Sequence, residues 1–278
     1  MMGGMRIAIT GACGLFGRAV ASAALDAGHT VVAMDRPDRL GGFDRDGVTT
    51  VAVEATSADD VRAQAVGCDA FVHLAAVTSP SGRPAHVVHD NNVVASYAAL
   101  TAAADLGISR FVLASSVNAL GGAFSDRPRY DYFPVDEEHP SYAQDPYSLS
   151  KWIGEQQAAA VARQFPQMTI SVLRLHALVT DRAAMRHLLD TVVAHGGVKD
   201  LWGYTPLAPA ADAVLSALGL DAPGSTVYTL VSSRTSSDVP SAELARVHYP
   251  EVPLRAPLTG TASFFDSSRA RRALGWDA

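Results

Sequence analysis

The sequence has little cysteine, no concentrated positive charge and no long apolar run, and each shortage excludes a class of protein. Cys13 and Cys68 are the only cysteines in 278 residues, too few for a disulfide-stabilised scaffold, and they lack metal-ligand spacing with the histidines. Lys plus Arg number 22 against 28 for Asp plus Glu, a formal net charge of −6, which argues against nucleic acid as a partner. We expect no metal site.

A membrane-spanning helix needs roughly 20 consecutive apolar residues, and no stretch approaches that length. The opening MMGGMRIAIT leads straight into an apolar run and shows no signal-peptide cleavage region. We therefore expect a soluble, cytoplasmic chain with no membrane partner.

What the sequence does contain is a repeated alternation of apolar, β-branched runs with alanine-rich helical stretches. Strands are expected at 6–10, 30–35, 49–54, 69–76, 111–116 and 169–175, and helices ending near 27 and spanning 57–66, 91–106 and 147–165. Because the strands are apolar on both faces, helices should cover both sides of a parallel sheet. The pattern predicts an α/β fold, a Rossmann-like doubly wound parallel sheet.

Beyond Leu175 the alternation weakens. Helices are expected at 181–194, 209–219, 241–248 and 267–274, with one strand at 226–231. With no independent sheet pattern there, we expect a dinucleotide-binding domain at 1–175 and a small C-terminal substrate-binding cap at 176–278, partly packed into the first.

The segment 121–144 is predicted to be a long loop, of a length typical of functional lids or of disordered stretches. It is rich in proline, glycine, aromatic and acidic residues. Its DEEH segment, 136–139, is interpreted as solvated loop charge rather than a metal site.

The stretch TGACGLFG, residues 10–17, stands where a phosphate-binding turn belongs, directly after the first strand and opening the first helix. Gly11 permits the tight turn, Gly14 lets the backbone approach a pyrophosphate, and Gly17 allows the helix to pack closely on the strand. Free N–H groups at the start of the helix favour negative charge.

Asp35 ends the second strand, 18 residues beyond Gly17, near the spacing at which a carboxylate accepts hydrogen bonds from an adenosine ribose. A carboxylate there repels a 2′-phosphate and favours NAD. Arg36 and Arg39 could instead grip that phosphate, so NADP stays possible.

In DPYSLSK, residues 145–151, Tyr147 and Lys151 stand four residues apart on one face of an expected helix. The spacing alone leaves two alternatives, a solvated helix face or a phenol made acidic by a fixed cation.

Taken in order, TGACGLFG, Asp35, DAFVHLAA, Asn92 in NNVVAS, FVLASS, YSLSK and the terminal ARRALGW resemble the extended short-chain dehydrogenase/reductase superfamily, often labelled NAD-dependent epimerase/dehydratase. The resemblance runs over nearly the whole chain. It implies that Ser116, Tyr147 and Lys151 act together, with Asn92 fixing a proton-relay water.

The resemblance also implies a role for each catalytic group. An ammonium and the cofactor's positive nicotinamide would hold the Tyr147 pKa below its ordinary value of about 10, so that the phenol exchanges a proton while hydride moves. Lys151 would also hold the nicotinamide ribose, and Ser116 the substrate oxygen. Glu54 stands where the family usually has Asp to read adenine.

By position in the family pattern, the expected cofactor-binding residues lie in the glycine-rich turn, at strand ends and at the catalytic helix. They are Gly11, Gly14, Leu15, Phe16, Gly17, Asp35, Arg36, Glu54, Ala55, Leu74, Ala75, Ala76, Ser115, Tyr147 and Lys151.

Departures from the family pattern narrow the reaction. Dehydratases usually carry Asp-Glu directly after the catalytic Ser or Thr, but Val117 and Asn118 stand there; epimerases usually have Pro-x-Asn after the sixth strand, but Ala177 takes the place of the Asn. We expect an NAD-dependent dehydrogenase or reductase acting on a small sugar-like or polyhydroxylated alcohol or carbonyl. A sugar-nucleotide epimerase with tightly bound NAD and a non-catalytic dinucleotide sensor stay open as alternatives.

The residues expected to face the substrate are Thr78, Ser79, Ser116, Asn118 and His176. His176 could equally be a hydrogen-bonded structural histidine, and Thr78 and Ser79 could cap the following turn.

Two alanine-rich helical stretches, 96–105 and 155–162, offer flat faces of small residues. The simpler interpretation is packing on the sheet. In the family the corresponding helices often form a four-helix bundle, so the resemblance implies a C2 homodimer.

Overall fold

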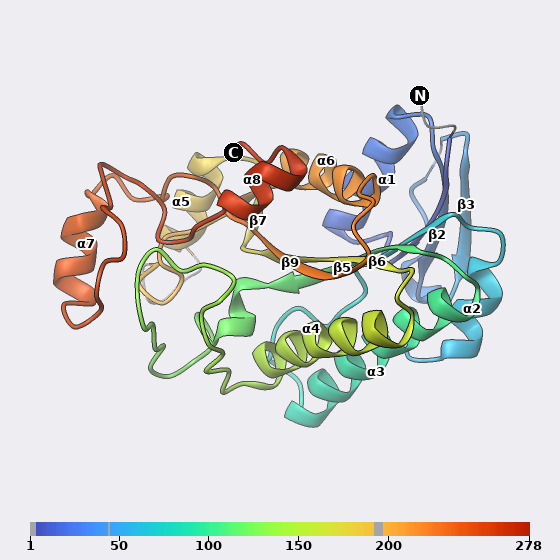
Figure 1. Ribbon diagram of the computed structural model, residues 1–278, viewed down its shortest axis with the longest axis horizontal. Coiled ribbons are helices and arrows are strands. Elements are labelled where there is room, and N and C mark those ends of the chain that lie inside the picture. Colours follow the sequence, from blue (N-terminus) through green and yellow to red (C-terminus); the bar gives the residue numbers. More distant parts are fainter. Residues whose placement is uncertain (1–3, 44, 192–196) are drawn as a thin grey trace.

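The computed structural model describes residues 4–43, 45–191 and 197–278, and a seven-stranded parallel sheet forms its centre (Figure 1). The strand order is β3-β2-β1-β4-β5-β6-β9. The strands are β1 (Arg6–Thr10), β2 (Thr30–Asp35), β3 (Val48–Ala52), β4 (Ala70–His73), β5 (Arg110–Ser116), β6 (Thr169–Leu175) and β9 (Gly224–Leu230). The predicted doubly wound parallel sheet is confirmed.

Two strands end earlier than their apolar runs predicted. β4 ends at His73 rather than residue 76, because the chain turns there to cross the end of β1, where the Ala75 backbone lies against Gly11. β3 ends at Ala52 rather than residue 54. The apolar runs locate the strands along the sequence, but they do not show at which residue a strand ends.

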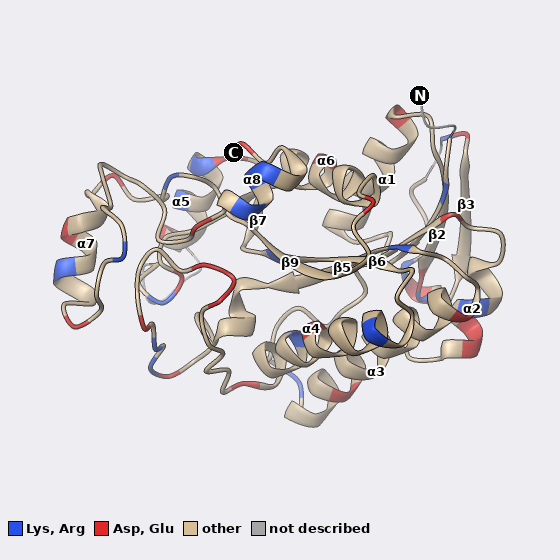
Figure 2. Ribbon diagram, viewed as in Figure 1, with Lys and Arg blue, Asp and Glu red and all other residues tan. Residues whose placement is uncertain are grey.

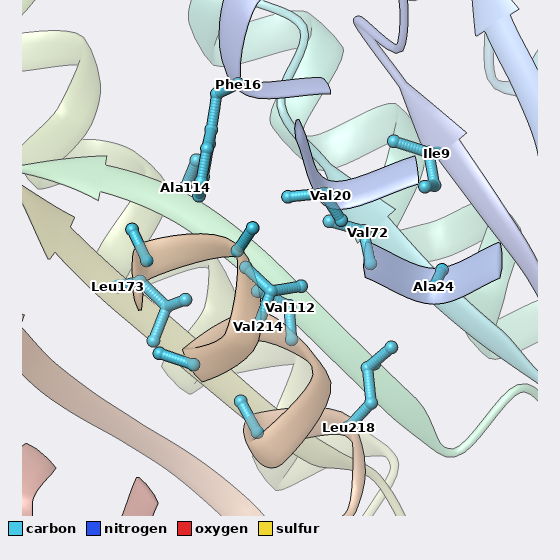
Figure 3. Packing of buried hydrophobic residues seen from close by; sticks show 14 of the residues in the cluster. Ile9, Phe16, Val20, Ala24, Val72, Val112, Ala114, Leu173, Val214 and Leu218 are labelled. Carbon is cyan, nitrogen blue, oxygen red and sulfur yellow. The ribbon is translucent and has the colours of Figure 1, made fainter. Parts of the chain in front are cut away.

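Helices cover both faces of the sheet, as Figure 1 shows. On one face lie α2 (Ala58–Ala65), α3 (Ala85–Asp105) and α4 (Pro146–Gln164); on the other lie α1 (Leu15–Asp26), α6 (Leu207–Leu218) and α8 (Ser268–Leu274). Figure 3 shows the second layer, in which Val20 of α1 and Val214 of α6 face Val112 of β5. Burying each such side chain contributes about 1.5–3 kcal/mol.

Helix α3 begins six residues before the expected position, directly after Pro84. The carbonyl of Pro84 accepts hydrogen bonds from the N–H groups of Val87 and Val88. Most of this first stretch is exposed, so it carries no apolar periodicity by which the helix start could be recognised.

Most alanines of the two alanine-rich stretches are buried within the protein. Those of α3 and α4 that pack between the helices and the sheet include Ala98, Ala99, Ala102, Ala103, Ala104, Ala158 and Ala162. The simpler interpretation, packing on the sheet, therefore holds for these residues, and they offer no face for a partner.

The second part of the chain contributes to the central layer as well as to a cap. β9 lies parallel to β6, with Leu173 opposite Tyr228, and α6 packs against α1. The predicted strand at 226–231 is thus the seventh strand of the main sheet.

The rest of the second part forms the cap, at the left in Figure 1. It comprises the two-stranded sheet of β7 (Leu178–Val179) and β8 (Thr205–Pro206), together with α5 (Arg182–Thr191) and α7 (Ser241–His248). Its separate hydrophobic cluster joins the segment after β5 to both helices. The last residues of the helix expected at 181–194 lie outside the described residues.

In the view of Figure 2, charged residues of both signs are spread over the outer helices and loops. Across the described part of the chain, no helix has the length and apolar character to cross a bilayer. The same residues contain no group of three His, Cys, Asp or Glu side chains arranged to hold a metal ion.

Candidate active site

The turn after β1 and the loop after β4 meet where the chain order in the sheet reverses. From β1 the chain continues to β2 on one side, and β4 lies on the other. Gly11 has a φ of +70°, and a Cβ there would lie 2.7 Å from the Ala75 nitrogen, so only glycine fits. In open α/β sheets, ligands bind in the crevice at such a reversal.

The glycine-rich turn has the shape of a phosphate cradle. A Cβ at Gly17 would overlap the Gly11 carbonyl oxygen and Ala12, which explains the close helix–turn packing. A Cβ at Gly14 would meet only that same oxygen, at 3.3 Å, so its other side is open to a ligand. No side chain caps the start of α1, which leaves Leu15 and Phe16 N–H groups directed at that space. The residues therefore fit a dinucleotide pyrophosphate.

Asp35 closes the turn from the end of β2. Its Oδ2 accepts a hydrogen bond from the Cys13 N–H at 2.9 Å, and its Oδ1 accepts one from the Arg36 N–H at 2.9 Å. The Arg36 guanidinium turns away and pairs with Asp38 at 3.0 Å in an exposed position. The carboxylate thus lies at the end of the cradle where an adenosine ribose is expected.

Glu54 is an exposed turn residue before α2. Its Oε1 accepts hydrogen bonds from both the N–H and the hydroxyl of Thr56, and its own N–H donates to Asp60. This geometry matches a strand-end surface acid at least as well as an adenine-reading group. Ala55 beside it is half-buried.

Tyr147 lies in the first turn of α4. The helix starts there because Asp145 caps it, accepting hydrogen bonds from the N–H groups of Tyr147 and Ser148 at 3.0 and 2.9 Å, and because Pro146 suits the first helical position. The phenol is 8% exposed.

Ser116 and Lys151 approach Tyr147 from β5 and from one turn further along α4. The Ser116 hydroxyl accepts a hydrogen bond from the Asn118 N–H at 3.1 Å, and its proximity to the phenol lowers the pKa of Tyr147. The Lys151 Nζ lies 5.8 Å from the centre of the phenol ring and donates to the Ala114 carbonyl at 2.8 Å. The structure thus brings together the three residues that the sequence singled out.

The electrostatics of the phenol differ from the expectation. Burial raises the pKa of Tyr147 to about 12; the Ser116 hydrogen bond lowers it and the Asp145 charge raises it further. Burial lowers the pKa of Lys151 to about 8, partly offset by Glu155. In the chain by itself, desolvation of the phenol outweighs the neighbouring ammonium, which donates to the Ala114 carbonyl. The expected lowering of the Tyr147 pKa by the ammonium and a bound nicotinamide together stays a prediction.

Asn92 clamps the loop after β4. Its Oδ1 accepts from the Val77 N–H at 2.8 Å, and its amide donates to the Val77 carbonyl at 3.0 Å and to Ser150 at 3.1 Å. The side chain therefore positions a loop instead of reaching a reacting atom.

Beside Asn92 lies a small polar cavity with a volume of about 10 Å³, room for about one water molecule. Its polar lining consists of His73, Asn92, Ser96, Ser115, Ser150 and Lys151. A relay water at Asn92 stays a prediction, and this cavity is where we expect it.

Most of the predicted substrate residues have other partners. Ser79 accepts a hydrogen bond from the Ser81 N–H at 3.1 Å, so it caps a turn, while Thr78 is exposed. The Asn118 side-chain carbonyl accepts from the Ala123 N–H at 2.9 Å and holds the start of the long loop.

His176 has no ring nitrogen left for a substrate. Its Nδ1 accepts from the Ala177 N–H at 2.7 Å, and its Nε2 donates to the Asp200 carbonyl at 2.9 Å. Burial lowers its pKa, which keeps it neutral. Of the two alternatives, the structural histidine is the one the geometry supports.

Residues 7–204 match the model of the NAD dependent epimerase/dehydratase family. The chain belongs to this family. The resemblance drawn from the motifs is thereby confirmed.

The chain is similar in sequence to one curated protein and similar in fold to two solved structures described here. The chain is 28% identical over 183 residues to dTDP-6-deoxy-L-talose 4-dehydrogenase (NAD(+)) of Aggregatibacter actinomycetemcomitans, a match covering 64% of this chain and 63% of that protein's length. It is similar in fold to a short-chain dehydrogenase/reductase superfamily protein from Agrobacterium tumefaciens with bound NAD, with a TM-score of 0.72, 23% identity, and coverage of 98% and 92% of the two chains. It is similar to UDP-N-acetylglucosamine 4-epimerase from Bacillus cereus, with a TM-score of 0.69, 20% identity, and coverage of 99% and 93%.

A residue of the long loop that the sequence did not single out lies against the phenol. Phe124 meets Tyr147 edge to face, with ring centres 5.6 Å apart, and is 36% exposed. The loop is held there because Lys199 donates to the Ser125 carbonyl at 2.7 Å. The aromatic content of the loop signalled a lid, but not which ring would reach the site.

Two charged residues behind the site were also missed. Glu155 and Arg174 form a buried ion pair at 2.8 Å. Both had a signal in the sequence: Glu155 follows Lys151 by four residues, and Arg174 is the lone charge in the apolar strand TISVLRL.

The interpretation of 136–139 as solvated charge is wrong for Glu137 and His139. The Glu137 carboxylate is 4% exposed, accepts a hydrogen bond from the Thr229 N–H at 2.8 Å and faces Arg269 at 3.5 Å. His139 is buried and accepts from the Asp131 N–H. The reason is that β9, far along the chain, presents an N–H group to this loop.

Proposed function

We propose that the protein is an NAD-dependent oxidoreductase that transfers a hydride between the nicotinamide and a small sugar-like or polyhydroxylated alcohol or carbonyl substrate, with Tyr147 as general acid/base. The observation that carries this proposal is the grouping of Ser116, at the carboxyl end of β5, with Tyr147 and the half-buried Lys151 at the start of α4. Membership of the NAD dependent epimerase/dehydratase family supports it.

NAD, when bound, supplies the hydride acceptor or donor. The chain's own residues do the rest. The open side of Gly14 and the start of α1 bind the pyrophosphate, and Asp35 accepts hydrogen bonds from the adenosine ribose.

At the reacting end, the phenol of Tyr147 carries its proton at neutral pH, because its pKa is raised to about 12. It donates that proton to a substrate carbonyl oxygen in the direction of reduction, and Ser116 hydrogen-bonds the same oxygen. Phe124 covers one side of the phenol and keeps water from it.

The size of the substrate is the finer part of the proposal. The named relative is a dehydrogenase of a dTDP-linked sugar, which keeps nucleotide-linked sugars among the candidates. The absence of Asp-Glu after Ser116 speaks against dehydration.

A panel assay tests the proposal. NAD and NADP reduction is followed by the absorbance of the reduced nicotinamide, against free sugars, uronates, polyols, hydroxy acids and dTDP- or UDP-linked sugars. We expect turnover with NAD and a hydroxyl-bearing substrate, and its loss in Tyr147→Phe with dinucleotide binding retained. Turnover unchanged in Tyr147→Phe contradicts the assignment.

Whether NAD stays bound to the protein distinguishes the alternative, an epimerase, from a dehydrogenase. An epimerase keeps NAD tightly bound through purification and interconverts two sugars without added cofactor. A dehydrogenase releases reduced cofactor stoichiometrically with product. A chain that binds dinucleotide but turns over no member of the panel would favour the sensor.

A C2 homodimer stays part of the proposal, with a changed interface. The exposed large apolar side chains of the two long helices are Val87 at 39%, Val94 at 46% and Tyr97 at 49% on α3, and Leu149 at 36% and Trp152 at 38% on α4. α3 and α4 lie side by side, so these residues, rather than the alanines, would pair in a four-helix bundle. Light scattering at micromolar concentration tests it: a monomer contradicts the dimer, and Tyr97→Glu should separate a dimer into monomers.

A further inference from the structure

A cluster of buried charged groups runs behind the catalytic face, from Lys151 through Glu155 to Arg174. Arg174 donates two parallel hydrogen bonds to Glu155, from Nε to Oε1 at 2.9 Å and from Nη2 to Oε2 at 2.8 Å. Ser115 donates a third, to Oε1 at 2.6 Å. The Arg174 and Glu155 side chains are 6% and 3% exposed. Three donors thus hold the Glu155 carboxylate in one orientation.

Stability alone is a weak explanation for this pair. Taking two charges out of water costs several kcal/mol per ion, and well-packed apolar residues often replace such a pair without loss. The pair is also placed where a charge matters. Tyr147, Lys151 and Glu155 follow one another along the same face of α4, each one helical turn apart. Lys151 therefore lies between the phenol and the Glu155 carboxylate.

Resting on the proposed function, we propose that Glu155, oriented by Arg174 and Ser115, is the positioning residue that keeps Lys151 an ammonium ion beside Tyr147. Glu155 touches neither substrate nor the reacting atoms. It acts through Lys151, whose Nζ is anchored on the Ala114 carbonyl at 2.8 Å.

The electrostatics around Lys151 agree with this role. Burial lowers the pKa of Lys151 to about 8, and the Glu155 charge is the contribution that raises it. Removing the carboxylate therefore moves the pKa below 8, toward neutrality, and the cation is lost in a larger share of the molecules at neutral pH.

The other groups around Lys151 do not replace Glu155. β4 presents His73, which is neutral because its pKa is about 3, and α4 presents Tyr147, whose pKa is about 12. β6 presents Arg174, a cation that is paired with Glu155. The groups presented by α3 and by β5 with its following turn are neutral: Asn92, Ser115 and Asn118.

The sequence makes a direct test simple, because Lys151 and Lys199 are its only lysines. The full-length protein is labelled with lysine carrying ¹³C at Cε, and the two signals are followed by NMR against pH. Lys199→Arg assigns them. We expect the Lys151 signal of the unaltered protein to titrate near pH 8. In Glu155→Gln its midpoint should fall by about one unit or more, a tenfold change in the protonation equilibrium, with the Lys199 midpoint unchanged.

Asp238→Asn is the matched control. It removes a carboxylate that pairs with Arg182 and Arg186 away from the site, so it should leave the Lys151 midpoint where it is. If Glu155→Gln leaves Arg174 unpaired and prevents folding, the double variant E155Q/R174M removes both charges. Its Lys151 midpoint should also fall below that of the unaltered protein, by less than in Glu155→Gln, because the Arg174 cation is gone as well.

A Lys151 midpoint that stays constant in every folded Glu155 variant overturns the inference. So does an equal fall in Asp238→Asn, because the effect would then be one of net charge. The titration needs neither substrate nor dinucleotide. A chain that shows the shift but no turnover therefore contradicts the proposed function alone, and a chain with turnover but no shift contradicts the role of Glu155 alone.

Discussion

Replacing Asn92 by alanine should destabilise the protein by about 2–3 kcal/mol, because two hydrogen bonds to the backbone of Val77, one to Ser150 and one from Asn91 disappear together. A net hydrogen bond is worth about 0.5–1.5 kcal/mol. Asn92 is buried, but Val77 is half-buried and its freed backbone groups can partly reach water, which keeps the sum at the lower end of what four lost bonds allow.

The measurement is the free energy of unfolding from urea titration, compared with Asn91→Ala. Asn91 donates one bond to Asn92 and is less buried, so it should cost about 0.5 kcal/mol. Turnover in Asn92→Ala should fall with a raised KM, because the loop from residue 74 to 79 is released. A loss of stability no greater than that of Asn91→Ala, combined with a large fall in kcat at unchanged KM, would refute the clamp and restore a direct part in proton transfer.

Three further predictions follow from single contacts. Tyr147→Phe should lower kcat by about 10²–10⁴-fold. Its melting temperature should stay within a few degrees of that of the unaltered protein, because Ser116 keeps its hydrogen bond from the Asn118 N–H. Equal kcat values for the two proteins would contradict the acid/base role. Asp35→Ser should raise the ratio of NADP to NAD turnover, since the carboxylate that repels a 2′-phosphate is gone, and an unchanged ratio in the same assay would place cofactor choice elsewhere. His73 is neutral when folded, with its pKa lowered from 6.5 to about 3, so its contribution to stability is complete above pH 6.5 and is lost as the pH falls toward 3; His73→Gln, compared with the unaltered chain by urea unfolding at pH 7 and pH 4.5, should show a smaller loss on acidification, and parallel losses would exclude His73 as the source.

The features that the sequence predicted well are local. The glycine-rich turn places three glycines within seven residues, and the Tyr147–Lys151 spacing spans one helical turn, so both are visible without knowing the fold. The six strands of the first part were found because each is a short apolar run between turn signals. Their assembly into one parallel sheet follows from the helices between them.

The features that the sequence did not predict depend on partners far along the chain. Glu137 looked like a surface acid until β9 placed the Thr229 N–H beside it, 92 residues away. The clamp that Asn92 makes on the Val77 backbone was also not predicted, because the sequence does not show that the loop after β4 lies against α3.

The pKa of Tyr147 is another such case. Its direction depends on how completely the phenol is desolvated, which no spacing of residues reveals. The chemical roles of the site residues stay predictions.

The seventh strand has a consequence for how the protein is made. β9 pairs with the edge of β6, and α6 packs on the sheet beside α1. The first 175 residues therefore lack part of their sheet and core until the chain has been synthesised beyond Leu230. A fragment ending at residue 175 would expose the bare side of β6 and an uncovered patch of Leu173 and Val112, both of which invite self-association. We therefore expect the two parts of the chain to fold together as one unit.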